Sequence, residues 1–302
     1  MDPIDLYAQL GGSPDGLPQI HSQTFETENG TPYLKHAGVA MVARPHTDIS
    51  GLRPFLEGFA DDLDFPSYLD DPTELTDGAQ LLKTAGQVCY ASFGPQRTYN
   101  ENASRYFANQ RHGGHGSVLE HAMYSFLCYG ISRSNTHEIV RHRAGTAFSQ
   151  LSQRFVSGKV LRFVERPEYQ QHPSLHKRFE ERIERAAREY DEVADELLTL
   201  QSDGDQLLSA EARTDRRKRV QQSARSVLPN EAETILVLSA NVRSWRHMIE
   251  MRTDAHAESE IRDLFFRIFL CLRVAEPILF EDYTINANPD GTFGASTDWR
   301  KV

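Results

Sequence analysis

The segment that most constrains the fold lies near the C-terminus, where residues 257–280 read AESEIRDLFFRIFLCLRVAEPILF. Its apolar side chains recur at helical spacing, which predicts a long helix. A helix this apolar needs a core to pack into, and 302 residues are enough to form one. Arg267 and Arg273 interrupt the run, so no stretch is long enough to span a bilayer. We therefore expect a globular, cytoplasmic protein with no membrane partner.

The charge and the cysteines of the chain exclude several classes of protein. The formal net charge is −10, so a protein-wide attraction to nucleic acid is not expected, and any anion site must be a local concentration of positive charge. Cys89, Cys128 and Cys271 are far apart and form no CxxC pair, which argues against a disulfide framework and a cysteine-rich zinc site. The acidic N-terminus, MDPIDLYAQL, does not fit a signal peptide.

The order of the patterns predicts an α+β fold, with a small sheet early and a mostly helical second half. Strand-like patterns occur at residues 38–46, 117–132 and 155–167. Helical spacing occurs at residues 51–63, 77–92, 134–143, 176–200, 213–229, 233–252 and 257–280. Ser134 or Asn135 is the candidate N-cap of the third of these helices. Residues 1–35, rich in Gly, Pro, Thr and acidic groups, predict an irregular extension, and residues 36–302 predict a single domain.

Two histidine-bearing segments are candidates for chemistry. HEIVRH, residues 137–142, nearly matches a zinc-protease motif, but its histidines lie ~140° apart on a helix, so we expect no metal site. HGGHGSVLEH, residues 112–121, has glycines that let the backbone approach a ligand closely. The same residues also fit a flexible turn in which Glu120 and His121 form a local pair.

The stretch RHRAGTAFSQLSQRF, residues 141–155, concentrates Arg141, Arg143 and Arg154 in an acidic chain. Such a cluster can solvate a surface, bind an anion or tune a cofactor. Arg225, just before Pro229, is by itself a surface arginine.

The segment SANVRSWRHMIEMRTDAH, residues 239–256, carries two polar stripes if it is one helix. Asn241 and Arg252 fall along one stripe, and Arg243 and His247 along another. Two stripes suggest contact with more than one ligand or subunit, but an ordinary amphipathic helix fits as well.

Four segments in order resemble the flavin-dependent thymidylate synthases (ThyX). They are GHGSVLEHAMYSF, the RHR that is followed by Ser152 and Arg154, ARSVLP, and NVRSWRHMIEMRTDAHAESEIR, and the resemblance covers residues 76–282. It implies a ThyX-like α+β fold, with a small antiparallel sheet packed with long helices. It also implies a homotetramer whose active sites lie at subunit interfaces.

The resemblance implies methylation of a uridine monophosphate, dUMP to dTMP, at C5. Methylenetetrahydrofolate would donate the carbon, reduced FAD the hydride, and NADPH would re-reduce the flavin. This chemistry needs no nucleophile from the protein, which agrees with the lack of a Cys–His constellation in the sequence.

The resemblance also assigns residues. The implied flavin contacts are His115, Ser117, Arg141, His142, Arg143, Gln150, Asn241, Val242, Arg243 and His247. The implied nucleotide contacts are Glu138, Arg141, Gln150, Leu151, Ser152, Gln153, Arg154, Arg225 and Arg252. Arg252 is the implied catalytic residue, because a fixed guanidinium beside uracil N3 would favour its ionisation and activate C5. Arg154 and Arg225 would bind the phosphate, since guanidinium groups offer it forked donors.

The sequence departs from the family pattern at several positions. Residues 144–151 separate RHR from Ser152, one residue more than the pattern, and the extra residue falls around Gly145–Phe148. Gln150 replaces a common glutamate, and HAESEIR replaces HAQWEIR. Glu138 stands where the family often has glutamine, and its carboxylate could repel an anion or accept a hydrogen bond from an added sugar hydroxyl. Two alternatives therefore remain: a UMP methylase of nucleoside-antibiotic synthesis, and a non-catalytic nucleotide- or RNA-binding relative.

Overall fold

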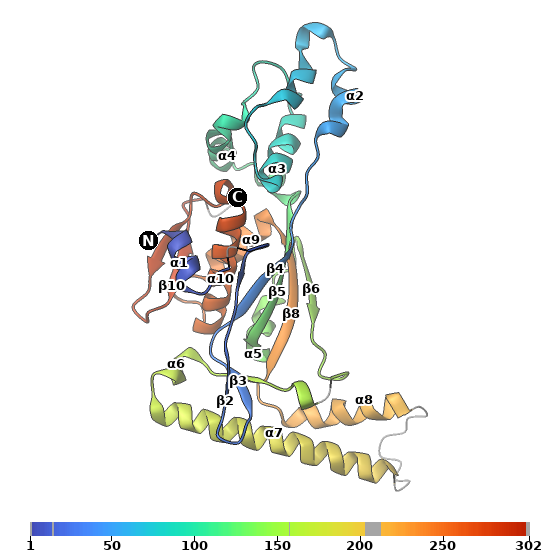
Figure 1. The fold of residues 1–302 in the computed structure, drawn as a ribbon, viewed down its shortest axis with the longest axis vertical. Coiled ribbons are helices and arrows are strands. Elements are labelled where there is room, and N and C mark those ends of the chain that lie inside the picture. The colour runs from blue at the N-terminus through green and yellow to red at the C-terminus, as the bar shows by residue number, and fades with distance from the viewer. Residues whose placement is uncertain (1, 14, 157, 203–212, 300–302) are drawn as a thin grey trace.

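The computed structural model describes residues 2–13, 15–156, 158–202 and 213–299, and the molecule is elongated (Figure 1). A lobe of short helices lies at one end, a sheet with its helices in the middle, and two long helices at the other end. Among the helices that the structure describes, none combines the length and the apolar content needed to cross a membrane.

The central sheet has five strands and is antiparallel throughout. Their order across the sheet is β1 (Gln19–Ile20), β4 (Gly38–Ala43), β5 (Met123–Ser132), β8 (Glu233–Asn241) and β6 (Thr146–Gln150). Alternate side chains of β5 and β8, such as Phe126 and Leu238, are fully buried on one face, as the period of a half-buried strand requires. The predicted strand at residues 38–46 is confirmed, and the one at 117–132 is confirmed from Met123 onward, after a 3₁₀ turn at Gly116–Glu120.

The apolar C-terminal segment forms α10 (Ser259–Ala275), as predicted, and it lies at the centre of the core. It contacts α1 (Pro3–Gln9), α9 (Val242–Arg252) and strand β4. Arg267, one of the two arginines that interrupt the run, is buried and donates through Nε to Asp263 Oδ1 at 2.9 Å. The α+β class is therefore confirmed, with its core built around the most apolar segment of the chain.

One predicted helix, residues 233–252, is wrong in its first half. Residues 233–241 form β8, and α9 begins only at Val242. Asn241 is the N-cap, because its Oδ1 accepts the backbone N–H of Ser244 at 2.9 Å. The apolar residues ahead of Asn241 pair with β5 and β6 over long sequence distances, and this pairing overrides the local helical spacing.

Helices α3, α5, α7 and α8 follow the predicted helical segments with shifted ends, whereas α4 and α6 were not predicted. The remaining α-helices are α2 (Arg53–Leu56), α3 (Asp77–Val88), α4 (Ala103–His112), α5 (Arg133–Ile139), α6 (Pro167–Gln170), α7 (Pro173–Ser202) and α8 (Arg213–Ala224). The N-cap of α5 is Ser132, whose hydroxyl accepts the N–H of Asn135, and neither Ser134 nor Asn135 is the cap. In the segment 51–63 a single helical turn forms, flanked by 3₁₀ turns.

The N-terminal segment is not irregular, in contrast to the prediction for residues 1–35. Besides α1 and β1 it forms β2 (Thr24–Glu26) and β3 (Pro32–Leu34). Strand β3 pairs in parallel with β7 (Phe163–Val164), which is all that forms of the strand predicted at 155–167. The turn-forming composition of this segment is real, but pairing with distant strands orders it.

The chain ends in a two-stranded hairpin of β9 (Thr284–Ala287) and β10 (Phe293–Ser296). It packs beside α10 and contacts α9 (Figure 1).

Candidate active site

The predicted site residues lie in two regions at opposite ends of β6. The RHR region surrounds its first residue, Thr146, and contains Glu138, Arg141–Arg143, the start and the end of α9, and the glycine-rich loop 113–117. The SQLSQR region surrounds its last residue, Gln150, and contains residues 149–154, Arg225 and the start of α5. A strand of this length separates its first and last residues by roughly 13 Å.

The RHR region contains a cavity with a volume of about 400 Å³. The lining residues are Glu120, Arg141, His142, Arg143, Ala144, Gly145, Thr146, Asn241, Arg243, Ser244, His247 and Met248. The lining residues at positions 141–146 and 241–248 meet at this cavity because β6 pairs with β8, with Thr146 opposite Ala240. The pairing thus brings Arg141 and Arg143 to the same cavity as Arg243.

The range expected to contain the extra residue, Gly145–Phe148, begins in a turn that lines this cavity. Gly145 has a φ of +65°, and a Cβ there would lie 2.4 Å from Asn241 Nδ2. Its carbonyl oxygen accepts the N–H of Asn241 at 3.1 Å, and the Ala144 carbonyl accepts the hydroxyl of Ser244 at 2.7 Å. The longer turn is therefore bonded to the first turn of α9, and it requires glycine at position 145.

Arg252, at the end of α9, is held by three acceptor atoms of two residues, Glu138 and His142. Its Nη1 donates to Glu138 Oε2 at 2.7 Å, its Nη2 to the Glu138 carbonyl at 3.2 Å, and its Nε to His142 Nε2 at 2.8 Å. The guanidinium plane is thus fixed by these bonds, and Arg252 lines a second cavity of about 760 Å³. His247 lines both cavities.

His142 is the neutral member of this arrangement. Burial, then the positive charge of Arg252 and then His247 lower the pKa of His142 to about 4. The two imidazole rings meet edge to face, with their centroids 5.9 Å apart. Because Nε2 accepts a hydrogen bond, the proton of the neutral ring lies on Nδ1.

The glycine-rich loop runs directly against Arg243 at the start of α9. A Cβ on Gly116 would lie 3.0 Å from Arg243 Nε, so the backbone passes close to the Arg243 side chain. Arg243 Nη1 donates to Glu120 Oε1 at 2.6 Å, so the partner of Glu120 is Arg243. His115 and Ser117 are exposed on the loop beside the cavity. Glu120 is thus paired with Arg243 rather than with His121, and the close approach of this loop to a ligand stays a prediction.

In the SQLSQR region the side chains are ordered by the neighbouring strand and helix. Gln150 Nε2 donates to the hydroxyls of Thr136 at 3.0 Å and Thr234 at 3.3 Å. Ser152 Oγ accepts the N–H of Arg154 at 3.4 Å, and the exposed Arg154 guanidinium lies 5.7 Å from the Phe155 ring. Leu151 and Gln153 line a small cavity of about 30 Å³.

Sequence reasoning missed Arg133, the first residue of α5. Burial and the nearby Arg225 guanidinium lower the pKa of Arg133. Neither side chain forms an ion pair with the residues that the structure describes. The missed signal was an arginine in the first turn of a helix, where the helix dipole disfavours a cation. Two adjacent, partly buried guanidinium groups without a carboxylate favour an anion between them.

Glu258 and Ser259, the two residues that depart from the family pattern HAQWEIR, both contact other side chains of this chain. Glu258 pairs with Arg166, and Ser259 Oγ donates to Glu168 Oε1 at 2.5 Å. Val242 is fully buried, so its side chain belongs to the core and only its backbone can contact a ligand. Among the described residues, no group of three or more His, Cys, Asp or Glu side chains is placed to hold a metal ion.

The two regions do not share a cavity within the described part of one chain. Arg141, Arg143 and Arg243 line the first cavity, Arg252 lines the second, and Arg154 and Arg225 line neither.

Comparison with known proteins gives consistent relatives. The family model described as thymidylate synthase complementing protein matches residues 73–278. The chain is 37% identical over 227 residues to a flavin-dependent thymidylate synthase of Mycolicibacterium gilvum, covering 75% of this chain and 88% of that one. It is 37% identical over 231 residues to one from Mycobacterium tuberculosis, covering 76% and 90%.

A solved structure shares the fold. The crystal structure of a UMP/dUMP methylase, PolB, from Streptomyces cacaoi bound with 5-Br dUMP matches with a TM-score of 0.54 and 16% identity, covering 82% of this chain and 94% of that one. At this identity the likeness concerns the fold alone.

Proposed function

The chain belongs to the flavin-dependent thymidylate synthase family, and from this premise we propose that it methylates dUMP at C5 to give dTMP. The observation that carries the proposal is the clamped Arg252 beside a cavity lined by arginines. Methylenetetrahydrofolate is the proposed carbon donor, and NADPH the proposed reductant of the flavin.

The RHR cavity fits the anionic part of FAD. Arg141, Arg143 and Arg243 line it, and it lies at the first turn of α9, where free N–H groups and the helix dipole favour anions. The residues that would hold FAD are His115, Ser117, Arg141, His142, Arg143, Gln150, Asn241, Val242, Arg243 and His247. When bound, reduced flavin supplies the hydride, and the protein supplies orientation and charge.

The nucleotide phosphate fits the SQLSQR region. Arg133 and Arg225 form an uncompensated pair of guanidinium groups, and Arg154 and the Ser152 hydroxyl lie on the adjoining segment. A phosphate dianion accepts forked guanidinium donors and hydroxyls, and it would cancel the repulsion between Arg133 and Arg225. Gln150, Leu151 and Gln153 complete the proposed nucleotide contacts.

Arg252 is the proposed catalytic residue. Glu138 and His142 use three of its N–H bonds and fix its plane, and its remaining N–H bonds can donate to the uracil. Because His142 stays neutral, it orients Arg252 without repelling it further. A guanidinium held at uracil N3 stabilises the N3 anion, which raises electron density at C5.

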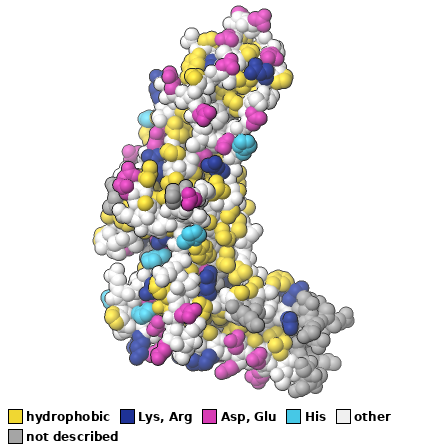
Figure 2. Space-filling view, in the orientation of Figure 1, with side chains coloured by type: hydrophobic (Ala, Val, Ile, Leu, Met, Phe, Trp, Pro, Cys, Tyr) yellow, Lys and Arg dark blue, Asp and Glu magenta, His cyan; other side chains and the backbone are white. Residues whose placement is uncertain are grey.

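A homotetramer with sites at subunit interfaces would join the two regions. The face of the central sheet away from the core carries partly exposed apolar side chains, among them Leu127 and Val237, and Met123 is 42% exposed. Figure 2 shows apolar side chains over the middle of the molecule, in the area of β6 and β8. Burying such a face against another copy is favourable, and it would place the SQLSQR region of one chain near the RHR region of another.

The alternatives predict different assay results. Purified protein should be yellow or should take up FAD, and it should methylate dUMP in the presence of methylenetetrahydrofolate and a reductant. Glu138 is bonded to Arg252, so its carboxylate does not by itself favour a ribose hydroxyl. Faster turnover of UMP than of dUMP would replace the proposal with the UMP methylase. A colourless protein that binds nucleotide but no added FAD would replace it with a non-catalytic binding protein.

A further inference from the structure

The C-terminal strap, residues 284–299, consists of β9, β10 and the residues that follow. It lies beyond residues 73–278, which the family model matches. Nevertheless, the strap contacts residues that are adjacent to the proposed active site.

The first contact is at the end of α9. The Thr253 hydroxyl donates to the Ala295 carbonyl and accepts the Ala295 N–H, both at 2.9 Å, and all these groups are buried. A Cβ on Gly294 would lie 2.6 Å from the Thr253 carbonyl oxygen, so strand β10 passes very close to this residue. Thr253 directly follows Arg252, so the strap fixes the backbone from which the catalytic guanidinium projects.

The second contact is with the loop after α9, residues 253–258, which lines the cavity at Arg252. Arg262 joins this loop to the turn of the hairpin. Its Nη1 donates to Asp290 Oδ2 at 2.7 Å and to Thr292 Oγ1 at 2.6 Å. Its Nη2 donates to the carbonyls of Ala255 at 3.2 Å and Ala257 at 2.8 Å. The buried Arg262 therefore makes the loop and the hairpin one unit.

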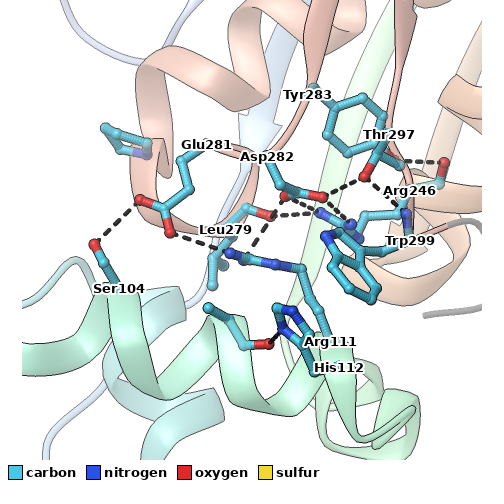
Figure 3. A network of polar contacts seen from close by, with 12 residues as sticks. Ser104, Arg111, His112, Arg246, Leu279, Glu281, Asp282, Tyr283, Thr297 and Trp299 are labelled. Atoms are coloured by element: carbon cyan, nitrogen blue, oxygen red, sulfur yellow. Dashed lines mark hydrogen bonds and ion pairs between the residues drawn. The ribbon is translucent and has the colours of Figure 1, made fainter.

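The third contact is with α4, directly before the glycine-rich loop. The Trp299 ring lies on the His112 ring with centroids 4.1 Å apart (Figure 3). His112 is followed by Gly113 and Gly114, the latter at a φ of +69°. The backbone N–H of Trp299 donates to Thr297 Oγ1 at 3.1 Å, so the two strap residues are fixed relative to each other.

A buried network anchors the end of the strap. Figure 3 shows Asp282 accepting from Arg246 at 2.7 and 2.9 Å and from the Thr297 hydroxyl at 2.5 Å. Arg111, next to His112, lies 3.7 Å from the same carboxylate and 3.2 Å from Glu281. The ion pairs of Arg246 and Arg111 with Asp282 therefore connect α9 with α4, and the hydrogen bond from Thr297 joins the strap to them.

A loop with several glycines loses much conformational entropy when it orders on a ligand. A contact that orders it beforehand improves affinity without touching the ligand. We propose that the C-terminal strap positions both walls of the active site, the glycine-rich loop through Trp299 and the Arg252 end of α9 through Ala295. This inference rests on the proposed function for the identity of the ligand, and it makes Trp299 a positioning residue.

The test compares Trp299→Ala with Trp299→Phe, and uses two readouts in the full-length protein: amide hydrogen exchange of residues 112–117 without added FAD, and the FAD dissociation constant. We expect Trp299→Ala to speed exchange in this loop and to weaken FAD binding about tenfold, the effect of losing one ring contact. Trp299→Phe should restore both. Asn286→Ala, which removes an exposed bond to Ser296 within the hairpin, is the matched control and should change neither.

His112→Ala removes the same ring contact from the other side, and gives a second test if Trp299→Ala does not fold. The double variant should be no worse than either single variant, because one contact is lost in all three. Unchanged exchange in residues 112–117 in folded variants would overturn the proposal, as would additive effects. Failure of the wild-type protein to bind FAD would contradict the proposed function. The exchange measurement would still test whether the strap orders residues 112–117.

Discussion

The RHR region and the SQLSQR region differ in how their positive charge is balanced. In the RHR region Arg252 is paired with Glu138 and Arg243 with Glu120, at 2.7 and 2.6 Å. In the SQLSQR region Arg133 and Arg225 repel each other, and neither has a carboxylate partner among the described residues. Fixed pairs give orientation, whereas an uncompensated pair gives affinity for an anion. This difference supports the proposal that the first region positions Arg252 and that the second binds the nucleotide phosphate.

The largest expected effect tests the positioning role. Arg252→Lys keeps the charge but loses the forked donors that bond Glu138 and His142, so kcat should fall about 100- to 1,000-fold while dUMP still binds. Steady-state kinetics and calorimetric dUMP binding separate the two quantities. Arg273→Lys, in a half-buried arginine of α10 that lines neither of the two cavities at the site, is the control. Turnover at the wild-type rate would remove Arg252 from the chemistry.

The next effect tests the binding role. Arg225→Ala and Arg133→Ala should each weaken dUMP affinity about 10- to 100-fold, since a hydrogen bond to a charged group contributes roughly 1.5–3 kcal/mol. Turnover at saturating dUMP should change far less. Arg217→Ala, in an exposed arginine of the neighbouring helix α8, should leave the affinity unchanged. If affinity is retained in both variants, the phosphate does not lie in this region.

A smaller effect tests whether the regions of different subunits cooperate. Mixed oligomers of Arg252→Lys and Arg225→Ala chains contain some sites with an intact RHR region and an intact SQLSQR region. Activity after co-refolding, measured at a dUMP concentration well below saturation, should therefore exceed that of either parent. Activity equal to the average of the two parents would show that each site is built within one chain.

The smallest effect concerns pH. The pKa of His142 is about 4 in the folded protein, below the ordinary value of 6.5, so the unfolded state binds more protons between these values. Folding stability should therefore rise as pH increases from about 4 to about 6.5, and His142→Asn should weaken this dependence. NMR titration of the His142 ring, assigned with that variant, measures its pKa. A midpoint near 6.5 would contradict the neutral acceptor beside Arg252.

The parts of the site that could be predicted from the sequence differ from the other parts in one respect. This respect is the number of residues that separate the interacting side chains along the chain. The residue types of the RHR and SQLSQR segments, and their separation, could be read from 15 consecutive residues, 141–155. The clamp on Arg252 joins residues 110 and 114 positions apart, and the approach of Arg133 to Arg225 spans a similar gap. No local pattern carries that information, so Arg133 was missed and Glu138 was assigned only to the nucleotide.

The sequence by itself determined the central helix α10, the soluble type of composition and the residues able to carry the chemistry, because these depend on apolar spacing and residue type within short windows. Only the tertiary structure decided that residues 233–241 are a strand, that the N-terminal segment is ordered and that the strap reaches both walls of the site. Strand pairing and buried ion pairs depend on segments that meet only after folding. Their free energy outweighs local propensity wherever the two disagree.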